Sequence, residues 1–73
     1  MPVTLANVHD VFTYHVPTAD QPARYAKVRM AAEQLAIVIL QEVRNSGDQQ
    51  AAIRHVREAM LTAHDGIATE GLV

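Results

Sequence analysis

Residues 12–40 have the sequence FTYHVPTADQPARYAKVRMAAEQLAIVIL, and this stretch decides the fold. Its first six residues are mostly aromatic or β-branched, which disfavours a helix, and Pro17 pushes Val16 into an extended conformation. We therefore expect an extended hook at the start of the stretch. The remainder carries the strongest helical pattern in the chain, and it predicts a helix over residues 20–44.

The start and the buried face of this helix are both marked. Thr18–Gln21 fits a capping box, Asp20 is an alternative N-cap, and Pro22 suits the first helical turn. Apolar residues then recur at spacings of three and four, which is typical of one buried helical face. The members of this stripe are Tyr25, Val28, Ala32, Leu35, Ile39 and Val43.

An apolar belt follows on the same helix, because residues 35–40 (LAIVIL) are all apolar and surround the helix axis. A hairpin of two helices cannot cover every side of such a run. We therefore expect the outward side chains of Ile37, Val38 and Leu40 to contact another subunit.

A break at residues 45–48 (NSGD) separates this helix from a second one over residues 49–68. Gly47 can adopt the left-handed stop conformation, and Ser46 or Asp48 can cap the second helix. The short connection predicts antiparallel packing. The apolar stripe expected to face the first helix consists of Ile53, Val56, Met60, Ala63 and Ile67.

The sequence thus predicts an all-α fold in one domain, residues 1–73: an N-terminal arm or short helix followed by an extended hook over residues 1–19, an antiparallel helical hairpin, and a frayed tail over residues 69–73. A domain of this size buries only about 60% of its unfolded surface. The chain is nevertheless 49% hydrophobic and only 19% charged, so we expect a homo-oligomer.

Composition also limits the location and chemistry. The chain contains no Cys, no signal-peptide pattern and no apolar run long enough to cross a bilayer, which predicts a cytoplasmic protein without membrane contact. A net charge of −2 argues against polynucleotide binding. The His residues lack metal-ligand spacing, and no nucleophile, paired carboxylates or Gly-rich phosphate loop is evident. We therefore expect no metal, no cofactor and no enzymatic activity.

Two side chains are candidates for ligand binding. Arg29 lies about 40° around the helix from Tyr25, on the shoulder of the buried stripe, which is unusual for a basic residue. An ion pair with Glu33 or a snorkelling side chain is the ordinary explanation. Tyr14 in the hook could stack on a flat ring, although such a residue more often pins a hook onto its helices.

A second set of polar residues lies along the second helix. Arg57 and His64 flank its apolar stripe and could form a polar cluster with Arg54, but a solvated helix edge is the commoner outcome.

The hook and helix carry a family resemblance. The matching residues are Phe12, Tyr14, His15, Pro17, Thr18, Gln21, Arg24, Tyr25, Val28, Arg29, Ala31, Ala32, Leu35, Ala36, Glu58, Ala59, Ile67 and Ala68. This pattern resembles the small helical-hairpin domain of phage cyclic-oligonucleotide sponges. These proteins sequester the signal molecules of CBASS immunity, and a related hairpin occurs in sponges that counter Thoeris.

The resemblance implies a function and a site. In the family a hook Tyr stacks on a base of a cyclic dinucleotide and a later basic residue pairs with its phosphate. Tyr14 and Arg29 resemble these two residues, and Phe12, His15 and Pro17 are their neighbours in the hook. The resemblance also implies a homo-oligomer, commonly a hexamer, acting in the host cytoplasm if the gene is phage-encoded. Some relatives have a second pocket for cyclic trinucleotides.

Two other functions remain open at this point. The protein could be a structural or protein-interaction hairpin whose apolar belt builds an oligomer. A small DNA-binding regulator is disfavoured because the net charge is negative and the chain has no basic recognition face.

Overall fold

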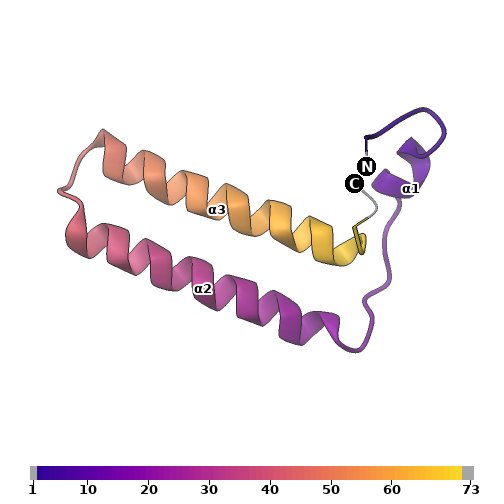
Figure 1. Ribbon diagram of the computed structural model, residues 1–73, viewed down its shortest axis with the longest axis horizontal. Helices are drawn as coiled ribbons and strands as arrows, with labels where there is room; N and C mark the ends of the chain where they lie inside the picture. Colours follow the sequence, from indigo (N-terminus) through magenta and orange to yellow (C-terminus); the bar gives the residue numbers. More distant parts are fainter. Residues whose placement is uncertain (1, 72–73) are drawn as a thin grey trace.

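The computed structural model describes residues 2–71, and within them the chain forms three helices (Figure 1). Helix α1 spans Val8–Phe12, α2 spans Gln21–Glu42 and α3 spans Gly47–Ala68. The two long helices pack side by side and antiparallel, and α1 lies beyond the C-terminal end of α3. The prediction of an all-α fold built on a two-helix hairpin is confirmed.

The N-terminal arm contains a short helix, one of the two forms expected for it, and this helix extends into the first residue of the expected hook. Phe12, which was expected to begin the hook, instead ends α1, and the chain becomes extended only from Thr13. The amide N–H of Thr4 donates to the side chain of Asn7 at 2.7 Å, and Val8 N–H donates to Thr4 O at 2.8 Å. These local hydrogen bonds start the short helix, and side-chain chemistry of this kind is not visible in an apolar pattern.

The start of α2 agrees with half of a capping box. Asp20 occupies the N-cap position but makes no capping hydrogen bond with its side chain. The Gln21 side chain does reach back, because its Oε1 accepts from the backbone N–H of Thr18 at 3.2 Å. Pro22 lies in the first turn, where no intrahelical N–H is needed.

The connection between the long helices differs from the prediction at Gly47. Ser46 caps α3 as expected, accepting from Gln49 N–H at 3.2 Å, but Gly47 is the first helical residue and does not stop α2. Val43 and Ser46 have extended backbones, so the connection needs no left-handed residue. The left-handed conformation occurs instead after α3, at Glu70 and Gly71, where Gly71 N–H donates to Gly66 O at 3.1 Å.

The seam between α2 and α3 follows a slightly different line from the predicted one. Ala36 is half-buried in the seam, whereas Leu35 and Val43, both assigned to the buried stripe, are 51% and 40% exposed. The reason is that residues 35–40 contain no polar side chain to mark the outer face. A spacing of four from Ala32 brings the small side chain of Ala36 to the partner helix.

On α3 the predicted stripe is confirmed at four of its positions and replaced at one. Ile53, Val56 and Met60 are half-buried and Ile67 is buried, but Ala63 is exposed. His64 takes its place in the seam, with its ring 5.0 Å from that of Tyr25 in an edge-to-face arrangement. The expectation of a solvated His64 is therefore not met.

The hairpin has a thin core for its size. Within residues 2–71 the buried side chains are one apolar residue, Ile67, and two glutamines, Gln21 and Gln49. The accessible surface is 5674 Å², whereas a folded monomer of 8.0 kDa exposes about 4,450 Å². The radius of gyration is 15.4 Å, against about 11 Å for a compact chain of 73 residues. The chain is thus elongated and leaves about 1,200 Å² of surface beyond the usual amount.

Candidate functional site

A buried glutamine fastens the hook to the end of α3. Gln21 is 2% exposed, and its side-chain amide donates to Ile67 O at 3.1 Å and to Glu70 Oε1 at 2.9 Å. Together with the bond from Thr18 N–H, these contacts join segments 46 residues apart in the sequence. We call Thr18, Asp20, Gln21, Arg24 and Glu70 the latch. Its position sets where the extended hook leaves the hairpin.

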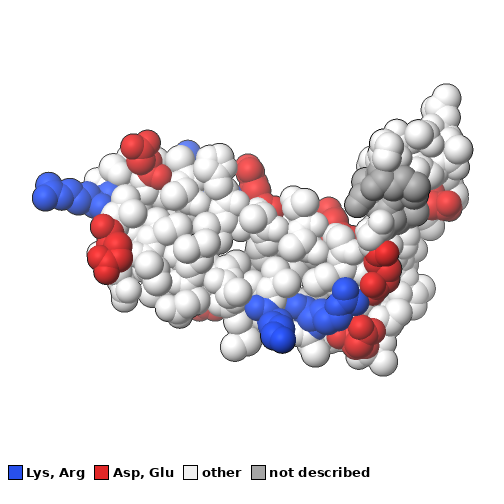
Figure 2. Space-filling model, in the orientation of Figure 1, with Lys and Arg blue, Asp and Glu red and all other residues white. Residues whose placement is uncertain are grey.

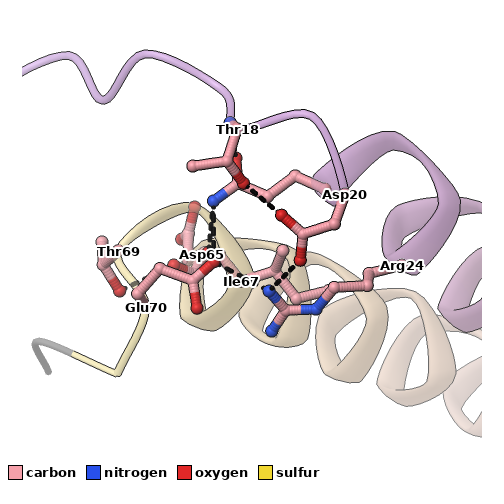
Figure 3. Close-up of polar contacts among 8 residues, drawn as sticks. Thr18, Asp20, Arg24, Asp65, Ile67, Thr69 and Glu70 are labelled. Carbon is pink, nitrogen blue, oxygen red and sulfur yellow. Dashed lines mark hydrogen bonds and ion pairs between the residues drawn. The ribbon is translucent and has the colours of Figure 1, made fainter.

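The outer part of the latch is ionic (Figure 3). Arg24 lies 2.8 Å from Glu70 Oε1 and 3.3 Å from Asp20 Oδ2, so it links α2 to the residues after α3. Hydrogen bonds from Gln21 and Arg24 lower the pKa of Glu70. A hydrogen bond from the Thr18 hydroxyl is the main cause of a lowered pKa at Asp20. Each carboxylate is thus held in its charged form.

The latch also changes the interpretation of the C-terminal residues. Thr69 is half-buried and Glu70 bonds to α2, whereas the sequence suggested fraying over residues 69–73. Leu72 and Val73 lie outside the described residues. Of the latch residues, Gln21 could be anticipated from its spacing to Thr18, but no sequence signal pointed to Glu70.

The aromatic side chains of Phe12, at the end of α1, and Tyr14, in the hook, are exposed to solvent. Tyr14 is 80% exposed and Phe12 is 82% exposed, so neither ring pins the hook onto the long helices. His15 is half-buried, and its Nε2 donates to Asp10 O across 2.8 Å, which folds the hook back on α1. Pro17 is exposed in the extended segment. The hook is therefore held to α1 through His15 at one end and to Gln21 through Thr18 at the other, and its aromatic ring is exposed.

A cavity of about 580 Å³ lies between the hook and the outer side of α3 near its C-terminal end. Phe12 and His15 line it, and so do Thr62 and Asp65. Tyr14 does not. Asp65 is the one charged side chain among the lining residues, so this cavity does not favour a phosphate.

Arg29 lies on a different part of the surface. It lines a groove of about 170 Å³ between α2 and α3, and the structure brings Arg57 to the same groove from the opposite helix. Arg54 and Arg57 share a separate depression of about 160 Å³ on α3. His64 lines neither of these grooves, because its ring is packed in the seam with a buried Nε2. The predicted second polar cluster is therefore divided between two places.

Tyr14 and Arg29 are not brought into one cavity by a single subunit. Tyr14 is on the hook and Arg29 is more than one helical turn into α2. A ligand that contacts both residues would therefore need the hook of one subunit and α2 of another, or a movement of the hook.

The outward side of the apolar belt is exposed as expected. Ile37, Val38 and Leu40 are 39–54% exposed, and Leu35 lines an apolar groove of about 490 Å³ along the seam. On the face in Figure 2, uncharged atoms cover most of the two long helices, and red and blue groups are spread near the edges. No continuous basic surface is visible on that face.

The chain matches no protein-family model, no curated protein and no solved structure. Within residues 2–71, none of the helices is sufficiently long and apolar to span a membrane. The site must therefore be interpreted from its own chemistry.

Proposed function

We propose that this protein is a cyclic-oligonucleotide sponge, which binds and sequesters a cyclic dinucleotide immune signal without cleaving it. Capture of the signal would block CBASS-type antiphage defence in the host cytoplasm. The observation that supports this most directly is the exposed ring of Tyr14, because an aromatic side chain held on an extended segment is suited to stacking on a nucleobase.

The second contact in the proposal is made by Arg29. A guanidinium can donate two parallel hydrogen bonds to phosphate oxygens, which a Lys ammonium cannot do. Phe12, His15 and Pro17 complete the hook side of the ligand site in this proposal. Cyclic trinucleotides are a further ligand class, for which Arg57 is an exposed polar residue, whereas His64 is packed in the seam.

The proposed site lies between subunits. A cyclic dinucleotide has two bases and two phosphates related by approximate two-fold symmetry, so a two-fold dimer would supply two copies of Tyr14 and Arg29. Two stacks and two charge-assisted hydrogen bonds contribute about 5–12 kcal/mol before the cost of association. Nanomolar affinity corresponds to about 12 kcal/mol, so additional contacts are required to reach it.

The surface of the single subunit is consistent with assembly. Its excess of about 1,200 Å² exceeds the roughly 800 Å² that each partner buries in a standard interface. Ile37, Val38 and Leu40 provide an apolar contact surface, and we propose that they lie at a subunit interface. A hexamer would require more than one such interface per subunit.

The experiment uses matched pairs of variants in isothermal titration against cyclic di-AMP, cyclic di-GMP and mixed cyclic dinucleotides. Tyr14→Ala should abolish binding while Tyr14→Phe, which keeps the ring, should retain most of it. Arg29→Ala should abolish binding, whereas Lys27→Ala removes the same charge from the opposite side of α2 and should have little effect. Normal binding by Tyr14→Ala or Arg29→Ala contradicts the assignment. Circular dichroism and light scattering must show unchanged helix content and assembly.

A second function is favoured by the exposed belt alone. A structural or protein-interaction hairpin would use Ile37, Val38 and Leu40 to form an oligomer without any nucleotide. A stable oligomer that shows no heat of binding with the whole nucleotide panel would support this function over the sponge.

A further inference from the structure

The groove that contains Arg29 has two arginines rather than one. Arg29 comes from α2 and Arg57 from α3, and both side chains are exposed at the mouth of the same groove of about 170 Å³. The floor between them consists of Ala32, Ala36, Ile53 and Met60, together with Val56. Two arginines thus line one apolar groove from opposite helices, and both are exposed at their side chains.

Neither guanidinium is neutralised by a neighbouring carboxylate. The ion pairs within residues 2–71 involve Arg24 and His55, and neither Arg29 nor Arg57 takes part in one. Glu33 lines the same groove one turn after Arg29, but no ion pair joins them. The groove therefore carries two positive charges and one negative charge, and the positive side chains are available to an anion.

We infer that Arg29 and Arg57 together bind one phosphodiester of the ligand, so that Arg57 is a second phosphate-binding residue. A phosphodiester has two non-bridging oxygens, and two planar guanidinium groups from opposite helices can each donate to one of them. The inference rests on the proposed function for the identity of the ligand. It adds a contact that the Tyr14 and Arg29 pair does not supply.

The size of the groove agrees with a phosphate and not with a whole ligand. Pockets that enclose small molecules have volumes of about 300–1,000 Å³, and this groove has about 170 Å³. The sugar carbons next to the phosphate lie over the apolar floor, and the phosphate lies outside it, where the two exposed arginine side chains can reach it. The bases extend beyond it, where the hook of another subunit can reach them.

The chain contains a matched control for Arg57. Arg54 lies one turn earlier on α3, is exposed, and lines the neighbouring depression but not the Arg29 groove. Arg54→Gln and Arg57→Gln change the net charge equally, so any difference between them reports the groove itself. Arg57→Lys keeps the positive charge but removes the planar guanidinium group, which can donate two parallel hydrogen bonds.

The test is isothermal titration of wild type and these variants with the cyclic dinucleotide that binds wild type best. Arg57→Gln should weaken binding by roughly 10- to 100-fold, the loss expected for one charge-assisted hydrogen bond. Arg57→Lys should recover part of this loss, and Arg54→Gln should change the affinity by less than about threefold. Equal affinities for Arg57→Gln and Arg54→Gln would overturn the inference while leaving the sponge function intact.

A second measurement separates the two proposals if no cyclic dinucleotide binds. Pyrophosphate is titrated into wild type while NMR follows the Nε–Hε signals of the arginine side chains. The signals of Arg29 and Arg57 should move together, with smaller changes at Arg54, and the Arg29 shift should weaken in Arg57→Gln. An Arg57 signal that moves no more than that of Arg54 would overturn the shared anion site.

Discussion

The latch offers the most specific perturbation, which is replacement of Gln21 by Met. Methionine has a similar length and suits a side chain that is 2% exposed, so the change removes polar contacts with little change in volume. The Thr18 N–H loses its acceptor at 3.2 Å, and Ile67 O loses the Gln21 donor at 3.1 Å but keeps the Glu70 N–H at 3.2 Å. Glu70 loses the bond from Gln21 but keeps the bond from Arg24.

The magnitude follows from these contacts. One hydrogen bond contributes about 0.5–1.5 kcal/mol net, and Gln21→Met removes both the bond to Ile67 O and the bond from the Thr18 N–H. The bond to Glu70 is partly exposed, so it adds little to the total. We expect Gln21→Met to lower the free energy of unfolding by about 1–3 kcal/mol, with about 4–8 °C lost from Tm for each kcal/mol.

The assay is thermal and urea unfolding followed by circular dichroism at one fixed chain concentration, because assembly would make Tm concentration-dependent. Gln34→Met is the control, since Gln34 is exposed on the same helix. Amide hydrogen exchange supplies a local measurement: the Thr18 N–H should exchange faster in Gln21→Met. Equal stability of the two variants, or unchanged exchange at Thr18, would refute the role given to the latch.

The other predictions concern pH, assembly and helix capping. The pKa values of Glu70 and Asp20 are lowered on folding, so their stabilisation is fully present above their ordinary values of 4.5 and 3.8 and is lost as pH falls through the lower folded values. Urea unfolding between pH 7 and pH 2 should show this loss, and Glu70→Gln should reduce it; an unchanged pH profile in Glu70→Gln would contradict the latch. Leu40→Glu should lower the mass measured by light scattering, whereas Gln34→Glu, which adds the same charge outside the belt, should not; equal masses would exclude this belt as an interface. Ser46→Ala should lower the free energy of unfolding by about 0.5–2 kcal/mol and Ser46→Gly by only a few tenths, and equal losses in chemical denaturation would argue against the Ser46 cap.

The two long helices could be predicted because their signals are local. Regular apolar spacing marked each buried face, and Ser46 carried a cap signal that the structure confirms. The exact seam could not be predicted, since residues 35–40 are apolar on every side and leave Leu35 and Ala36 equivalent in the pattern. Packing against α3 decides between them.

The candidate site likewise has features that local sequence signals predict and features that depend on tertiary packing. Helical geometry placed Arg29 and Arg57 on the shoulders of their stripes, but only the register of α2 against α3 brings both to one groove. The spacing from Thr18 to Gln21 indicated a capping contact, yet the bond from Gln21 to Ile67 O spans 46 residues and depends on tertiary packing. His64 was misplaced because its polarity suggested solvent, whereas its ring packs on Tyr25.

In the proposed function the protein captures a cyclic dinucleotide intact, at a site shared by two subunits. Isothermal titration of wild type with the cyclic dinucleotide panel, followed by heat denaturation and chromatography of the released ligand, tests this most directly. We expect saturable binding at one ligand for every two subunits, with unaltered ligand recovered. Absence of binding across the panel, or recovery of a cleaved nucleotide, would contradict it.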